Sequence, residues 1–340
     1  MPRHIDLVLP GLFNLPVNEI DPDWLANQLP ALNQLLTYAS STPNHRYEFE
    51  AILADCMGLQ DRQTLPFAQA YVDDGAHDKH HYLLCRAIHL KADMHNALVI
   101  PLQDNAANRD DTALILEDLV NFFREDCDLD YIDDDLWLMR LKQCQPADFY
   151  PHYLSVIGRK ANQFIEQSRQ ALPWYQLVNE MQMFMHQHQI NQNRLSSGLL
   201  PINSLWFWGA GKLQAPSNGN IQWYCDDRQL ARYAKSAGIQ CLTLNQLANR
   251  ASHVDSVIID LTLLEALKST SSEQLQPKLT ALEQTVLQPV MTQVNNKKAT
   301  VRLRAGQRFD LTLGAFSKYR FWRSQRNLTN LNQQDTDACN

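Results

Sequence analysis

The stretch Ile221–Leu261, IQWYCDDRQLARYAKSAGIQCLTLNQLANRASHVDSVIIDL, decides the fold class of this chain. Three apolar runs in it are typical of buried strands, and they occupy 221–225, 239–244 and 256–261. Between the first two runs, residues 228–237 have a helical pattern that stops at Gly238. Strands that alternate with helices at this spacing pack as a parallel sheet with crossover connections. We therefore expect an α/β fold with a predominantly parallel sheet flanked by helices.

Segments on both sides of this stretch extend the same pattern. Near the N-terminus, the apolar run Ile5–Leu9 ends at Pro10-Gly11 and predicts a first buried strand. Near the C-terminus, 299–303 and 309–313 predict a closing pair of strands. We expect one α/β domain over 1–327. The tail 328–340 is rich in Asn, Gln and Asp, which predicts disorder.

The segment 60–145 differs in character from the rest and predicts a β-rich insertion or subdomain. We expect strands over 82–90 and 97–102, an amphipathic helix over 112–124, and a strand pair around the turn at 133–135. After it, a long helix is expected over 160–186. Pro173 predicts a break in that helix near Leu172.

Composition limits the class of protein further. The chain has 340 residues and a formal net charge of −7, so nucleic acid is not an expected partner. Seven scattered cysteines without a CxxC pair indicate reduced thiols in a cytoplasmic protein. No apolar run reaches the length of a membrane span or of a signal peptide, so we expect no membrane association.

A second informative stretch is Asn191–Gly211, NQNRLSSGLLPINSLWFWGAG. A polar loop that leads into a buried strand with a glycine exit is how α/β proteins place ligand-binding groups at the carboxyl edge of a sheet. The candidate ligand-binding residues are Asn191, Arg194, Asn203, Trp208, Gly209, Gly211 and Lys212. Backbone N–H groups at the glycine exit would bind a small anion; a tight turn of purely structural role is the favoured alternative. For Trp206 and Trp208, packing in the core is likewise favoured over a binding role.

This stretch resembles the archaeal-type cofactor-independent phosphoglycerate mutases of the alkaline phosphatase superfamily. The positions that fit the loop and strand of that family are Asn191, Arg194, Gly198, Pro201, Asn203, Gly209 and Gly211. Trp208 stands where the family has an arginine. The segments 29–40, 223–238 and 254–262 are similar to further family segments. The chain most resembles the bacterial RpfE-type regulatory or phosphoglycerate mutase-like proteins, through residues 203–211 and 320–323.

The resemblance implies an alkaline phosphatase/phosphoglycerate mutase-like fold and a centre of two metal ions held by Asp and His clusters. The family's first Asp-Gly-x-x-Asp is here Pro10 to Asn14, its Pro-x-x-Asp ends at Asn33, and no histidine follows Asp260. Near the C-terminus, Asp310 stands alone. Neutral residues cannot hold hard cations. We therefore expect a catalytically degenerate, regulatory or ligand- or partner-binding protein without catalytic residues, bound metal or cofactor. The alternative is a metal-dependent phosphoglycerate mutase or phosphatase whose ligands are rearranged.

Two more clusters have a functional and a plainer interpretation. His77, Asp78, His80 and His81 could chelate a metal ion, but an exposed hairpin tip is favoured. The basic-aromatic patch of Lys318, Arg320, Trp322 and Arg323 is the candidate partner-binding surface. Its alternative is a final strand whose arginines lie along the fold. The expected partners are a small anionic metabolite or a protein, and an interaction module that uses this patch is the second alternative function.

Overall fold

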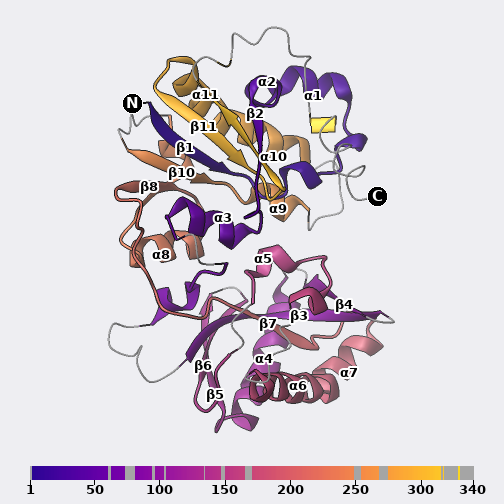
Figure 1. Cartoon of the computed structure of the whole chain (residues 1–340). Coiled ribbons are helices and arrows are strands. Elements are labelled where there is room, and N and C mark those ends of the chain that lie inside the picture. The colour runs from indigo at the N-terminus through magenta and orange to yellow at the C-terminus, as the bar shows by residue number, and fades with distance from the viewer. Residues whose placement is uncertain are drawn as a thin grey trace. The chain divides into compact units, whose positions relative to one another are not determined.

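The chain folds into two compact units, Met1–Asp61 with Ala215–Asn340 (unit 1) and Arg62–Gln214 (unit 2). The computed structural model describes residues 2–59, 63–72, 81–93, 96–102, 105–133, 135–146, 150–164, 171–248, 254–267, 275–314, 317 and 328–329. Each unit contains a sheet of its own (Figure 1). Unit 2 extends beyond the expected insertion at 60–145 and ends at Gln214.

In the described part of unit 1, seven strands form one sheet in the order β2-β12-β11-β1-β10-β8-β9. They are β1 Arg3–Val8, β2 Ser40–Pro43, β8 Ile221–Tyr224, β9 Gln240–Leu242, β10 Asp255–Ile259, β11 Ala299–Arg304 and β12 Phe309–Leu313. The five strands from β11 to β9 are parallel, and β12 and β2 add antiparallel pairs. The expected α/β class with a mostly parallel sheet is confirmed, as are the closing strands.

Helices cover this sheet. They are α1 Pro22–Gln28, α2 Pro30–Tyr38, α3 Phe49–Cys56, α8 Arg228–Ser236, α9 Thr262–Ala266, α10 Leu275–Leu282 and α11 Gln288–Asn295, with a π-helical turn Glu283–Leu287 between the last two. Pro30 ends one helix and begins the next, because proline is tolerated in a first turn but not in a helix interior. The Glu283 carboxylate accepts the Ala31 and Leu32 N–H groups and so caps α2.

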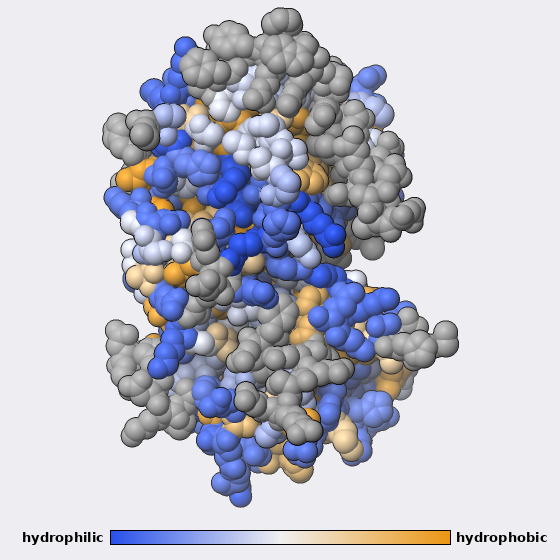
Figure 2. Space-filling view, viewed as in Figure 1, coloured by the Kyte–Doolittle hydropathy of each residue, from blue (hydrophilic) through white to orange (hydrophobic). Residues whose placement is uncertain are grey.

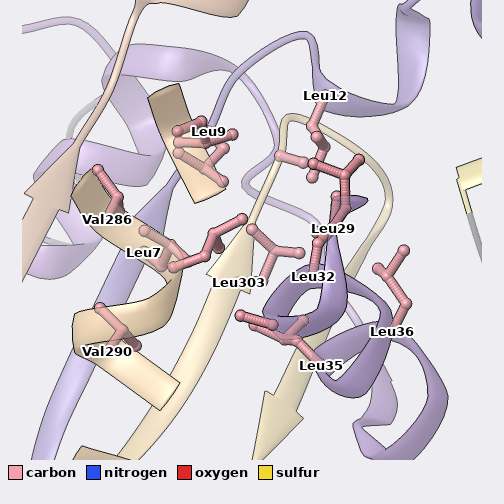
Figure 3. Packing of buried hydrophobic residues seen from close by; sticks show 14 of the residues in the cluster. Leu7, Leu9, Leu12, Leu29, Leu32, Leu35, Leu36, Val286, Val290 and Leu303 are labelled. Carbon is pink, nitrogen blue, oxygen red and sulfur yellow. The ribbon is translucent and has the colours of Figure 1, made fainter. Parts of the chain in front are cut away.

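The main core lies on one face of the unit 1 sheet. Leu7 of β1 and Leu303 of β11 lie between Leu32 of α2 and Val286 of the π-helical turn (Figure 3). All of these side chains are fully buried or nearly so. Because side chains alternate along a strand, Asp6 of β1 points to the opposite face, which α3 covers.

Unit 2 is built on an antiparallel sheet. Its strands are β3 His81–Asp93, β4 Asn96–Pro101, β5 Cys127–Asp133, β6 Leu136–Leu141 and β7 Ser204–Trp208, and β3 pairs with β4, β6 and β7. Its helices are α4 Ala106–Phe122, α5 Tyr153–Val156, α6 Leu172–Gln187 and α7 Gln189–Ser196. The expected strands, amphipathic helix and strand pair of 60–145 are confirmed.

Three expectations for the later part of unit 2 are wrong. The strand 204–208 does not belong to the parallel sheet but runs antiparallel to β3. All five of its residues are buried, and a strand buried on both faces has the same sequence pattern in either kind of sheet. Asn191 and Arg194 lie in α7 and not in a loop. The long helix begins at Leu172, with Pro173 in its first turn.

On the face that Figure 2 shows, hydrophilic residues make up most of the coloured surface. Among the described residues, the most exposed large hydrophobic side chains are Phe122 and Met183, both on helices of unit 2. None of the helices among the described residues is long and apolar enough to cross a membrane. Apart from Leu328 and Thr329, the tail expected to be disordered lies outside the described residues.

Candidate functional site

The parallel strands of unit 1 bring several polar groups to their carboxyl edge. After β1, Gly11 adopts a left-handed conformation (φ 85°) and leads into a short 3-10 turn that ends at Asn14. After β11, Gln307 donates to the Asn14 side chain at 3.0 Å. Asp260 follows β10. In open α/β sheets this edge is where ligands bind, so these residues form the candidate site of unit 1.

The Asp260 carboxylate at this edge already has a hydrogen-bond partner. Asp260 is buried, and its Oδ1 accepts both the Thr262 N–H at 2.8 Å and the Thr262 hydroxyl at 2.5 Å. Burial raises the pKa of Asp260, and the hydrogen bonds from Thr262 oppose that rise. The negative charge of Asp226 raises it further. The structural role of Asp260 is to fix the start of α9 at Thr262.

Asn33 does not face the edge as a ligand. Its Nδ2 donates to the carbonyl oxygens of Leu25 and Ala26, at 2.9 and 3.0 Å. The side chain therefore holds the end of α1 against α2. An amide that donates to two carbonyls has a structural role that a carboxylate cannot take over, because an ionised carboxylate has no donor.

Asp310, the carboxylate expected near the C-terminus, belongs to a buried charge network. This network lies on the face of the unit 1 sheet that α3 covers. The Arg304 guanidinium donates to Asp55 at 2.6 Å and lies 3.3 Å from Asp310, while Arg302 donates to Asp6 at 2.6 Å. Burial raises the pKa of Asp310, although the two arginines favour its ionised form. The carboxylates of Asp6, Asp55 and Asp310 thus form ion pairs with Arg302 and Arg304, which offset the cost of burying these charges.

Within the described part of the chain, no three His, Cys, Asp or Glu side chains come together in a way that could hold a metal ion. His77, Asp78 and His80 lie outside the described residues, and His81 is the first residue of β3. The donor groups that the structure places at the carboxyl edge of unit 1 therefore do not fit the two-metal centre that the resemblance implies.

The candidate ligand-binding residues of the second stretch lie in unit 2. Asn191 is completely buried; its amide donates to the carbonyls of Met185 and Ile202 and accepts the Ile202 N–H. The Arg194 side chain is 3% exposed and donates to Leu200 O, Asp111 Oδ2 and Asn108 Oδ1 at 2.6–2.9 Å. These contacts join α7 to α4 and to the turn before β7.

Asn203 and Trp208 also have partners inside unit 2. The Asn203 side chain accepts the Leu90 N–H and donates to the Leu90 carbonyl, so it continues the pairing of β7 with β3. The Trp208 ring is completely buried, stacks on Tyr153 at 5.9 Å and meets the edge of His152 at 5.5 Å. The favoured expectation that Trp208 packs in a core agrees with this position.

The glycine exit is required by a close approach of two backbones. Gly209 has φ 78°, and a Cβ added there would lie 2.9 Å from the Ala68 nitrogen, which donates to the Gly209 carbonyl. Gly211 also has positive φ and, like Lys212, is exposed. The patch of Lys318, Arg320, Trp322 and Arg323 lies outside the described residues.

Sequence reasoning missed the charge network and one cysteine pair. A usable signal was present for the network, since Arg302 and Arg304 alternate with apolar residues and so share one face of a strand. Cys225 follows the first strand of a βαβ unit and Cys241 lies within the second, which brings them together, and their sulfurs lie 3.3 Å apart.

Comparisons with known proteins give a fold and no family. No protein-family model matches the chain, and no curated protein matches it. The PH0037 protein from Pyrococcus horikoshii has a similar structure, with a TM-score of 0.50 at 11% sequence identity, over 98% of this chain and 93% of that chain. A cofactor-independent phosphoglycerate mutase from Thermoplasma acidophilum aligns with a TM-score of 0.43 at 12% identity, over 93% of this chain and 90% of that chain. The likeness to PH0037 concerns the fold alone, and from the weaker likeness to the mutase we draw nothing.

Proposed function

We propose that this chain is a phosphoglycerate mutase-like protein that lacks a two-metal phosphoryl-transfer centre and acts by binding a small anionic metabolite or a protein partner. The mostly parallel sheet of unit 1 and the sequence segments that resemble the mutase family support the first part. The polar groups at the expected metal positions support the absence of a two-metal centre. The proposed role is regulatory and not catalytic.

Asn33 carries this proposal. The resemblance requires a metal-binding aspartate at this position, and the residue here donates to the carbonyls of Leu25 and Ala26. An aspartate would turn its oxygens toward two carbonyl oxygens, which is repulsive and leaves both carbonyls without a donor. The local fold around Asn33 is therefore adapted to an amide and unsuited to a metal ligand.

The remaining positions support the same conclusion. Pro10 and Asn14 offer no carboxylate after β1, and Asn14 is bonded to Gln307. Asp260 is bonded to Thr262, and Asp310 accepts the Asn44 amide at 2.8 Å next to Arg304. Asp260 and Asp310, the carboxylates at two of the expected metal positions, therefore each have a partner within the fold.

The test combines metal analysis with an assay. The full chain is equilibrated with Mn²⁺ and dialysed, its metal content is measured by mass spectrometry, and phosphoglycerate mutase activity is assayed with Mn²⁺ present. We expect neither a stoichiometric metal at the core nor turnover. Stoichiometric metal together with turnover would overturn the proposal and favour the metal-dependent enzyme with rearranged ligands. A His77→Ala/His80→Ala/His81→Ala variant identifies any metal held by that loop.

The binding part has its own test, which uses exposed lysines because Arg194 is buried. A thermal-shift screen with phosphorylated metabolites should find a compound that raises Tm, since a ligand at one hundred times its Kd adds about 2.7 kcal/mol. We expect Lys212→Ala to lose this shift and Lys235→Ala, an exposed lysine of α8, to keep it. If no compound in the screen raises Tm, the hypothesis that the protein binds a phosphorylated metabolite is excluded. Charge reversal at Arg320 and Arg323 then tests the partner-binding patch by its effect on partner capture.

A further inference from the structure

A pair of cysteines lies on two neighbouring parallel strands of unit 1, Cys225 directly after β8 and Cys241 within β9. Their sulfurs are 3.3 Å apart, and the Cys225 N–H donates to the Leu242 carbonyl at 2.9 Å. The strand register pairs Cys241 with Trp223, so Cys225 lies diagonally from Cys241, and the 3.3 Å contact of the two sulfurs is what puts a disulfide within reach of side-chain rotation.

The two thiols differ in access to solvent. Cys225 is 3% exposed, whereas Cys241 is partly exposed on β9, which ends the sheet. The hydrogen bond from the Cys225 thiol lowers the pKa of Cys241, and the same contact, together with burial, raises the pKa of Cys225. The negative charges of Asp226 and Asp227 oppose the ionisation of both thiols.

This arrangement has the two parts that thiol-disulfide exchange requires. An accessible thiol that ionises first can attack an external disulfide, and a second thiol in contact with it can resolve the product. The described cysteines of unit 2 differ from this pair: Cys85 and Cys127 are buried, Cys144 is partly exposed, and burial raises the pKa of all three.

We propose that Cys225 and Cys241 form a redox-sensitive site that a low-molecular-weight disulfide of the glutathione class converts to an intramolecular disulfide. The Cys241 thiolate attacks one sulfur of the reagent, forms a mixed disulfide and releases one thiolate. Cys225 loses its proton and attacks the Cys241 sulfur, which releases the second thiolate. One reagent disulfide is reduced to two thiols, and the protein dithiol is oxidised to one disulfide.

The bond would close a loop that contains α8 and would join β9 covalently to β8. The same loop is already held by Asp226, whose carboxylate accepts the Leu244 N–H at 3.0 Å. Because a cross-link restricts the unfolded chain, we expect the oxidised protein to melt roughly 5–10 °C above the reduced protein. This inference does not depend on the proposed function.

The experiment titrates the full chain with mixtures of reduced and oxidised glutathione, followed by alkylation, intact mass measurement and peptide mapping. All samples carry Cys144→Ser and Cys339→Ser, so that these two thiols do not contribute. We expect the chain to lose two hydrogen atoms, to gain no glutathione, and to yield a peptide in which Cys225 and Cys241 are joined. Reduction should restore both thiols and the lower Tm.

Two variants separate the roles of the thiols. Cys225→Ser should retain one glutathione on Cys241, because the resolving thiol is absent, and Cys241→Ser should take up none at Cys225. Cys225→Ala serves if the serine variant does not fold. The proposal is overturned if both thiols of the parent protein stay open to alkylation in the most oxidising mixture. It is equally overturned if glutathione remains on Cys241 while Cys225 is present.

Discussion

At the scale of single residues, the chemistry of a side chain is decided by the partner that the fold gives it. Asn33 and Asp6 show this in opposite ways. The amide of Asn33 is useful because it donates, to Leu25 O and Ala26 O. The carboxylate of Asp6 is useful because it accepts, from Arg302 at 2.6 Å with His4 nearby at 3.5 Å. The hydrogen bonds of Asn33 and of Asp6 each lead to a prediction about the stability of the folded protein.

Replacing Asn33 by aspartate should destabilise the protein at pH 7. The change removes a donor and places a charge against two carbonyl oxygens, at a cost of about 1–3 kcal/mol. Urea unfolding measures the difference. Asn27→Asp, the same change at an exposed position of α1, is the matched control and should have little effect. An Asn33→Asp variant that binds Mn²⁺ with unchanged stability would contradict the structural role of the amide.

Asp6 predicts a dependence of stability on pH. Burial alone would raise its pKa, but hydrogen bonds from His4 and Arg302 outweigh burial and lower the pKa to about 2. A carboxyl with a depressed pKa in the folded state stabilises fully above the pKa of the unfolded state, near 3.8, and loses that contribution as the pH falls toward 2. The contribution is about 2 kcal/mol.

Asp6→Asn should therefore be less stable than the parent protein near pH 7, and the gap should narrow between pH 4 and pH 2. Chemical unfolding at several pH values measures the gap. Exposed Glu19→Gln is the control and should follow the parent at every pH. A gap that stays constant down to pH 2 would show that the ionised Asp6 carboxylate is not the source of the stability.

At the scale of elements, the segment 191–211 joins a helix and a strand of unit 2. The interior of α7 supplies Asn191 and Arg194, and β7 supplies the aromatic run that β3 pairs with. Trp206 and Trp208 share one face and Phe207 lies on the other, where it meets Trp174 of α6 at 4.8 Å. The segment thus connects helices to sheet within one unit.

Arg194 is expected to act as a structural cross-link between α7 and α4. Arg194→Ala leaves Asp111 and Asn108 without their donor and should destabilise unit 2 by about 3 kcal/mol. Arg194→Lys should not restore stability, because three acceptors in different directions need the planar guanidinium. Full stability of the alanine variant, measured by urea unfolding, would show that the side chain is not needed for folding.

Trp208 offers a test of what its strand position tolerates. Trp208→Arg, which restores the residue type of the mutase family, places a charge among Tyr153 and His152 in a fully buried position and should cost more than about 4 kcal/mol. Trp208→Phe removes volume but no hydrogen bond, since the indole nitrogen has no partner among the described residues, and should cost about 1–3 kcal/mol. Thermal unfolding ranks the two, and an arginine variant as stable as the phenylalanine variant would contradict the buried position.

At the scale of the whole molecule, two cores with different sheets imply separable stabilities. The large hydrophobic cluster that includes Leu7, Leu32 and Val286 consists of unit 1 residues alone. We expect Arg194→Ala to speed amide hydrogen exchange in α7 and β7 while β1, β10 and β11 keep their protection, because locally destabilised units open independently. A uniform rise in exchange across both units would instead show one cooperative unit.

Much of the fold could be predicted from local pattern. The strands and the helix expected within 221–261 indicated the parallel sheet. The missing carboxylates at Pro10, Asn14 and Asn33 could be recognised directly, since identity needs no coordinates. The partners of Arg194 and Asn203 could not be predicted from the sequence. Asp111 and Leu90 are far from them along the chain, and no local pattern specifies these contacts.

By itself, therefore, the sequence determined that the chain contains a mostly parallel α/β sheet and that neutral residues occupy the expected metal positions. Only the tertiary structure decided that β7 pairs with β3, that Arg194 is buried against α4, and that Cys225 meets Cys241. The physical reason is that periodicity reports the conformation and burial of one segment. Strand pairing, ion pairs and thiol contacts depend on which distant segment fills the space beside it.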